Sequence, residues 1–201
     1  MALFPLSAFA DRTVVDLSGR EWCVYRDFDA EWMEDDIYLP PVDVSRLPVN
    51  PPSGGWDSLW SRIEKTVHLP ATIEEHFTDI CDPGASGDYR GVSWWTTTVS
   101  AGPEFRGKRV YLDFESAHLR AEVFVNRKLV GYDVIGHTPF SVEATDAIIP
   151  GGVNEIAVRI TDPCGNFSWN DRTVHRWGKR FVPAAHGFGG ITGKVFLRAV
   201  D

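Results

Sequence analysis

The segment from residue 169 to residue 172 places a large aromatic side chain directly before an amide, a carboxylate and a guanidinium. Asn170 and Asp171 together supply hydrogen-bond donors and acceptors, which suits the vicinal hydroxyl groups of a sugar because each of them both donates and accepts. Trp169 offers a flat face for the apolar side of a pyranose ring. The same residues also have a structural interpretation, in which Trp169 packs beneath its own loop and Asp171 pairs with Arg172.

Basic or titratable side chains recur from residue 172 to residue 180, as Arg172, His175, Arg176, Lys179 and Arg180. In a chain with a net charge of −8 they form a local positive patch. Such a patch suits a carboxylate-bearing sugar such as a uronide, which would accept charge-assisted hydrogen bonds, or the acidic surface of a neighbouring domain. An ordinary solvated loop face is the third interpretation, and it stays open at this point.

Other catalytic and ligand-binding patterns are missing from the sequence. The run Gly84-Ala-Ser86-Gly87 lacks the spacing of a nucleophile elbow, and no phosphate-binding Gly-x-x-x-x-Gly-Lys loop occurs. The cysteines (Cys23, Cys81 and Cys164) are odd in number and far apart, so we expect no disulfide framework. No cysteine or histidine spacing suggests a metal site, and we expect neither a metal nor a cofactor.

The charge and hydropathy patterns exclude two classes of partner. An acidic chain argues against nucleic-acid binding, which depends on basic contacts to phosphates. No apolar run approaches the roughly 18–20 residues of a membrane span, so we expect no membrane partner. The segment 1–10 lacks a basic start and is interrupted by Pro5, so it makes a poor signal peptide. The compartment stays undetermined.

The elements that must position these side chains are predicted to be strands. The chain has 21 Val and 10 Ile against 11 Leu and 2 Met, and 31 of its 201 residues are Gly or Pro. This composition favours a β-rich fold with many turns. Apolar and polar residues alternate over 108–114, 119–125 and 154–160, which predicts strands with one buried face.

Turns recur every 8–14 residues, a spacing typical of an all-β antiparallel sandwich or jelly roll. We predict one helical turn within 71–80, a hairpin at Asn126 with positive φ, a return strand that ends at Gly131, and a turn at 150–152. The side chains expected between the two sheets are Val110, Leu112, Phe114, Val123, Val125, Ile156 and Val158.

Two segments do not alternate. The stretch 27–64 begins with six acidic residues in ten and continues with five prolines between Pro40 and Pro52, which predicts a solvated surface insert. A calcium site there is disfavoured because the Gly-punctuated acidic loop is absent. The stretch 161–193 is far longer than an ordinary connection, yet it holds Phe167, Trp169, Trp177, Phe181 and Phe188. Its length and aromatic content indicate an ordered, functional loop.

Seven short sequence motifs occur in the same order along this chain as in the N-terminal sugar-binding domain of family 2 glycoside hydrolases, which the chain therefore resembles. This family contains the β-galactosidases, β-glucuronidases and β-mannosidases. The motifs are Leu17-Ser-Gly19-Arg-Glu-Trp22, Tyr89-Arg-Gly-Val-Ser-Trp-Trp95, Phe114-Glu-Ser-Ala, Glu122-Val-Phe-Val-Asn126-Arg-Lys-Leu-Val-Gly131, His137-Thr-Pro-Phe140 with Ala144-Thr145, Asn154-Glu-Ile-Ala-Val158 and Gly189-Gly190-Ile191-Thr192-Gly193-Lys194-Val195. Arg127 and Glu143 depart from the family pattern, which usually has Gly and Asp there.

The resemblance implies one galactose-binding-like domain over 1–201, with the insert at 27–64 and a functional loop at 161–193. It implies no catalytic residue in this chain, because the family's two carboxylates lie on a following (β/α)₈ barrel. The partner would be a β-glycoside, shared with that catalytic domain. The expected substrate-binding residues are Trp169, Asn170, Asp171, Arg172 and His175. An autonomous carbohydrate-binding module or lectin and a purely structural sandwich are the alternatives.

Overall fold

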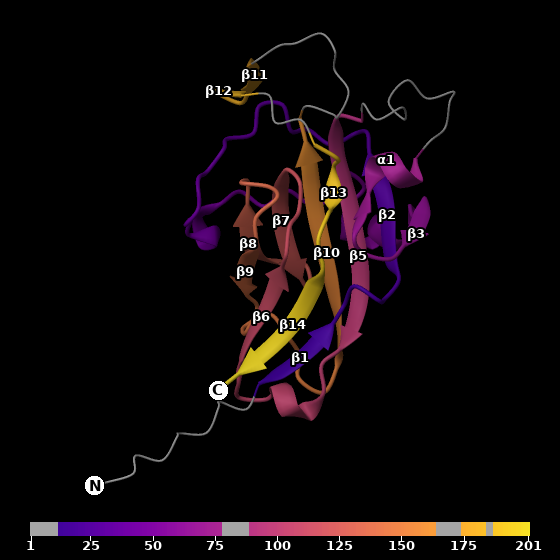
Figure 1. Ribbon diagram of the computed structural model, residues 1–201, viewed down its shortest axis with the longest axis vertical. Coiled ribbons are helices and arrows are strands. Elements are labelled where there is room, and N and C mark those ends of the chain that lie inside the picture. Colours follow the sequence, from indigo (N-terminus) through magenta and orange to yellow (C-terminus); the bar gives the residue numbers. More distant parts are fainter. Residues whose placement is uncertain (1–11, 78–88, 164–173, 184–186) are drawn as a thin grey trace, which may run out of the picture.

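The computed structural model describes residues 12–77, 89–163, 174–183 and 187–201, with the backbone alone for 174–176 and 181–183. Two antiparallel sheets face each other, as the all-β sandwich prediction requires (Figure 1). The four-stranded sheet has the order β1 (Thr13–Asp16), β14 (Val195–Val200), β6 (Arg109–Phe114) and β9 (Phe140–Glu143). The six-stranded sheet has the order β3 (Lys65–Val67), β2 (Trp22–Asp27), β5 (Gly91–Ser100), β10 (Val153–Asp162), β7 (Arg120–Val125) and β8 (Lys128–Asp133).

Smaller elements join the strands. The predicted helical turn is α1 (Ile73–His76), whose N-terminus is capped by the side chain of Thr72. Two-stranded sheets pair β13 (Gly190–Ile191) with β4 (Ala71–Thr72), and β11 (Val174–Trp177) with β12 (Arg180–Pro183). Three short 3₁₀ helices cover Val44–Arg46, Trp56–Ser61 and Pro103–Phe105.

The core lies between the two sheets, where the alternation of apolar residues places it. All seven side chains predicted there are at most 2% exposed. Trp22 and Trp95 are fully buried in the same cluster and account for part of the high tryptophan content. Burial of this apolar surface is the main stabilising contribution to the sandwich.

The outer face of the six-stranded sheet is buried as well, which corrects the expectation of one buried face per strand. In β7, Arg120, Glu122 and Phe124 alternate with the core residues and are nevertheless at most 1% exposed. The cover is the predicted insert, which begins at residue 28 because Asp27 is the last residue of β2; its Trp56 ring lies 5.0 Å from Phe124 and 5.6 Å from Trp94. The insert is therefore a packed layer over the sheet.

The acidic run at the start of the insert is only partly solvated, so that prediction was wrong for two of its residues. Asp27 lies at the end of β2 and is 3% exposed, and its Oδ2 accepts hydrogen bonds from the Trp94 indole (3.1 Å) and the Ser53 backbone N–H (3.0 Å). Asp35 contacts two buried arginines. Both carboxylates help to attach the insert to the sheet.

The hairpin between β7 and β8 has positive φ at both central residues, 49° for Asn126 and 68° for Arg127. Such a turn matches the twist of the flanking strands. The Asn126 side chain donates to the Ala147 carbonyl (2.7 Å) and accepts from the Glu155 N–H (2.9 Å), so its role is structural. Gly131 lies inside β8 and does not end it. A Cβ there would come 2.0 Å from Val142 Cγ1 of the opposite sheet.

Candidate functional site

The segment 161–193 leaves the sandwich at one end, where β10 ends and β7 begins (Figure 1). We refer to this as the loop end. Contrary to the expectation of a loop without alternation, the segment contains the β11–β12 hairpin and the short strand β13. Trp169, Asn170, Asp171 and Arg172 lie outside the described residues. For His175, the structure gives the backbone in β11, opposite Val182 of β12.

The β11–β12 hairpin rests on the insert through Trp177, which is fully buried. Its ring packs edge-on against Trp32, with centroids 6.4 Å apart. The next residue, Gly178, has φ of 59° and donates its N–H to the Met33 carbonyl at 2.8 Å. A Cβ at Gly178 would lie 2.2 Å from the Asp35 carbonyl oxygen, so only glycine fits this approach. Trp177 therefore anchors the hairpin to the insert, whereas the packing interpretation of Trp169 concerns a residue outside the described ranges.

Beneath the hairpin lies a buried ionic cluster of two arginines and two carboxylates. Arg159 and Glu122 face each other across β10 and β7, and Arg159 Nη1 lies 2.6 Å from Glu122 Oε2. Arg120 reaches Glu122 at 3.2 Å and Asp35 at 2.7 Å. Arg120, Glu122 and Arg159 are at most 2% exposed, whereas the Asp35 side chain is 20% exposed.

Residues of the insert supply further hydrogen bonds to this cluster. Asn50 donates to Glu122 at 2.8 Å, and Arg159 donates to the Glu31 carbonyl at 3.1 Å. The charges of the cluster balance, and each ion contacts an opposite charge, as buried ions require. We interpret the cluster as a structural support that fixes the insert beneath the hairpin. Strand alternation placed Arg120 and Glu122 on one face, but it gave no indication of the cover that buries them.

A groove of about 490 Å³ also lies at the loop end. It is lined by Pro70, Ala71, Thr72, Glu75, His137, Gly187, Phe188 and Thr192. Phe188 is 46% exposed and gives the groove an aromatic face. With a carboxylate, an imidazole and two hydroxyl groups nearby, the groove has the donors, acceptors and apolar surface that a sugar requires.

This groove was not predicted from the sequence, in which His118 and His137 are 19 positions apart and show no ligand spacing. The rings of His118 and His137 stack with centroids 4.5 Å apart. A Cβ at Gly187 would lie within 3.0 Å of both rings, so the backbone passes close to them. The glycine-rich run 187–190 was the available signal, since glycine often marks such an approach.

The residue before the groove-lining Glu75 carries a buried carboxyl group. Both side-chain oxygens of Glu74, in α1, are inaccessible to solvent. This burial raises the pKa of Glu74, against a smaller opposite effect of the nearby backbone N–H groups of Glu74 and Gly189. Folding therefore shifts the protonation equilibrium of this carboxyl group toward the protonated form, relative to the unfolded chain.

The described part of the chain contains no cluster of three or more side chains able to hold a metal ion. Within the same residues, no helix is long and apolar enough to cross a membrane. Cys23 is a free thiol. Cys81 and Cys164 lie outside the described ranges.

Comparison with known proteins relates the chain to large glycosidases. A β-glucuronidase of Formosa agariphila is 28% identical over 151 residues, which cover 72% of this chain and 15% of that protein. A β-galactosidase of Thermoanaerobacter pseudethanolicus is 39% identical over 120 residues, covering 57% of this chain and 14% of that protein. The chain is a distant homologue of the family 2 glycoside hydrolases. No family model matches it.

The fold of this family 2 homologue agrees with the sequence relationship. A family 2 glycosyl hydrolase from Bacteroides cellulosilyticus superposes on 92% of the chain with a TM-score of 0.55, at 20% identity, and 20% of that structure is covered. The chain spans 10–25% of the length of the curated relatives it matches. It therefore corresponds to one part of these glycosidases.

Proposed function

We propose that the chain is the non-catalytic carbohydrate-binding domain of a larger family 2 glycosidase. The observation that carries this proposal is the homology itself, which extends over much of the chain but over at most a quarter of each curated relative. A retaining glycosidase needs two carboxylates about 5–5.5 Å apart. In this proposal both lie on a barrel of roughly 250 residues outside this 201-residue sequence.

In this proposal, 1–201 acts as one domain and its loop end faces the substrate. The contacts come from Trp169, Asn170, Asp171, Arg172 and His175. Support comes from the adjacent structure, because Trp177 fixes the hairpin that carries His175 and the Phe188 groove opens at the same end. A loop attached in this way can hold polar side chains in place against a sugar.

The substrate we propose is a β-glycoside with an acidic sugar. Lys179 and Arg180, at the turn of the β11–β12 hairpin, are exposed and positively charged. They can attract a uronate carboxylate. The name of the Formosa agariphila relative points in the same direction.

The absence of catalysis in this chain can be tested directly. The purified chain should hydrolyse neither nitrophenyl β-glucuronide nor nitrophenyl β-galactoside, because both catalytic carboxylates belong to the barrel. Turnover that survives repurification and disappears on mutation of an acidic residue of this chain would overturn the proposal.

The role of the loop is tested in the complete glycosidase. Asp171→Ala removes one hydrogen bond to substrate, worth about 1–3 kcal/mol, and should lower kcat/KM by roughly 5- to 150-fold with little change in Tm. The matched control is Asp36→Ala, at an exposed carboxylate of the insert, which should leave kcat/KM unchanged. A fall in Tm with unchanged kinetics per folded molecule would instead assign Asp171 a structural role.

A further inference from the structure

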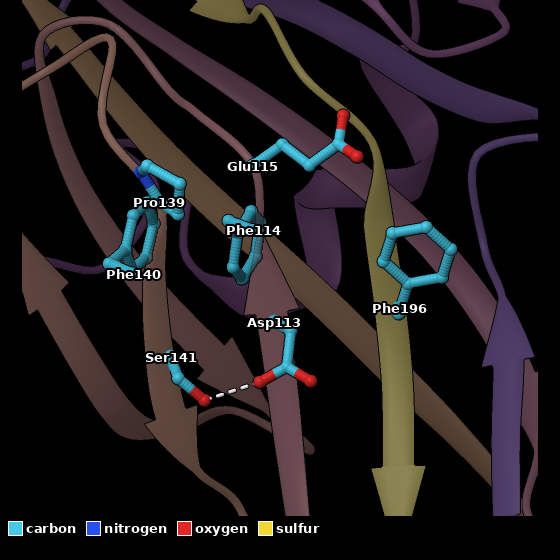
Figure 2. Close-up of a pocket in the computed structure, with 7 residues that line it drawn as sticks. All are labelled: Asp113, Phe114, Glu115, Pro139, Phe140, Ser141 and Phe196. Carbon is cyan, nitrogen blue, oxygen red and sulfur yellow. Dashed lines mark hydrogen bonds between the residues drawn. The ribbon is translucent and has the colours of Figure 1, made fainter.

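The outer face of the four-stranded sheet carries a second groove, of about 370 Å³ (Figure 2). Asp113 of β6 lies between Ser141 of β9 and Phe196 of β14, its direct neighbours in the antiparallel register. These three side chains share one face because residues opposite each other in a sheet point the same way. Glu115 and Pro139 extend the groove beyond the end of this row.

Apolar walls stand on both sides of the groove. Figure 2 shows Pro139 and Phe140 on one side and Phe196 on the other. Phe140 is opposite the core residue Phe114 in the register and stacks on it with centroids 4.7 Å apart and an interplanar angle of 2°, so it borders the groove from the inner side of the sheet. Phe196 is half-buried, so part of its ring remains available to a ligand. Phe196 is therefore the aromatic wall on the outer face.

The polar groups of the groove are already ordered. Arg198 donates to both carboxylate oxygens of Asp113, at 2.5 and 2.8 Å, and the Ser141 hydroxyl donates to the same carboxylate. These contacts, led by Arg198, lower the pKa of Asp113, so it is ionised at neutral pH and its charge is balanced. Glu115 is exposed, and its Oε2 accepts the Lys194 N–H at 3.0 Å.

We propose that this groove binds a neutral pyranose unit of a glycan. The ring packs its C–H face against Phe196, and its hydroxyl groups donate to the carboxylates of Glu115 and Asp113. A pocket of this size, mostly apolar with a few convergent polar groups, suits one small ligand. A uronate is disfavoured because its carboxylate would lie beside the carboxylate of Glu115, whereas the charge of Asp113 is balanced by Arg198.

This groove is separate from the loop-end groove, and the proposal does not depend on the proposed function. It requires only that the sheet face binds sugar, whether or not the loop contacts a substrate. The two sites would also differ in preference, because the hairpin at the loop end presents basic side chains and the sheet groove presents carboxylates.

The test is a titration of the ¹⁵N-labelled chain, followed by amide chemical shifts, with methyl β-D-galactoside, methyl β-D-glucoside and methyl β-D-mannoside. At least one neutral glycoside should cause saturable shifts centred on residues 113–115, 139–141 and 196. Methyl β-D-glucuronide should bind there more weakly. Saturable shifts with none of the three neutral sugars, or shifts confined to the loop end, would overturn the proposal.

Two variants with a matched control sharpen this test. Phe196→Ala removes one wall and should weaken binding roughly tenfold. Val14→Ala, at a 45% exposed apolar residue on the same face but outside the groove, should leave binding unchanged. Glu115→Gln removes one negative charge and should narrow the preference for neutral over acidic glycosides. Equal affinities for Phe196→Ala and the unmodified chain would contradict the proposed contact.

Discussion

The buried ionic cluster gives the sharpest stability prediction, through the substitution Glu122→Gln. Glutamine keeps the size of the side chain but removes the charge that faces Arg159 at 2.6 Å and Arg120 at 3.2 Å. Both arginines are 2% exposed and would then share only the carboxylate of Asp35. Removing one partner of a buried ion pair costs about 3–5 kcal/mol, because it leaves an uncompensated buried charge.

A loss of this size is a large fraction of the roughly 5–15 kcal/mol that stabilises a typical domain. For a chain of this length it corresponds to a fall in Tm of about 6–20 °C. The assay is urea unfolding followed by tryptophan fluorescence, for which the eight tryptophans give a strong signal. The control is Glu143→Gln, which breaks the exposed pair with Arg109 and should cost at most about 1 kcal/mol.

A double variant tests the proposed cause. Adding Arg159→Met to Glu122→Gln removes one charge of each sign and leaves the Arg120–Asp35 pair at 2.7 Å. The double variant should therefore be more stable than Glu122→Gln alone. If the two sites were independent, their losses would add and the double variant would be less stable. The reasoning is refuted if Glu122→Gln lowers the free energy of unfolding by less than about 0.5 kcal/mol. It is also refuted if the double variant loses as much unfolding free energy as the two single variants together.

Three further predictions concern single positions. Arg127→Gly should stabilise the chain by about 1 kcal/mol in urea unfolding, because φ is 68° there and the exposed pair with Asp57 contributes little; a loss would contradict this. Gly131→Ala should lower the free energy of unfolding by about 1–3 kcal/mol through the clash with Val142, and adding Val142→Ala should recover part of that loss. Strictly additive losses of the two substitutions would contradict the contact. Burial raises the pKa of Glu74 above its ordinary value of 4.5. The stability that the protonated carboxyl group contributes is therefore fully present below pH 4.5 and is lost as the pH rises through the raised pKa. Glu74→Gln should thus stabilise at neutral pH, with the gain lost below about pH 4; a gain independent of pH would show that burial of the charge is not its cause.

The inner core was predictable because a side chain's face in a strand follows from its position alone. Val123 and Ile156 belong to runs in which large apolar residues recur at period two, and both are fully buried between the sheets. The hairpin at Asn126 was predictable for a similarly local reason, because asparagine tolerates positive φ.

The outer layer was not predictable, because it depends on contacts between residues distant in the sequence. Asp35 and Arg120 are 85 residues apart, and neither carries a local sign that it will be paired. An acidic, proline-rich segment usually extends into solvent, and here Asp27 and the two arginines override that tendency. For the candidate site, the aromatic content of the loop indicated order, but neither the anchoring role of Trp177 nor its contact with Trp32 could be predicted.

The contact between the hairpin and the insert limits how this protein can be redesigned. Gly178 donates to the Met33 carbonyl, and Trp177 packs on Trp32. A chimera that exchanges only the segment 161–193 with a relative would place a foreign hairpin on an unmatched surface. Residues 32–35 must therefore be transferred with it, and the two segments behave as a single exchangeable unit despite being separated by more than a hundred residues of sequence.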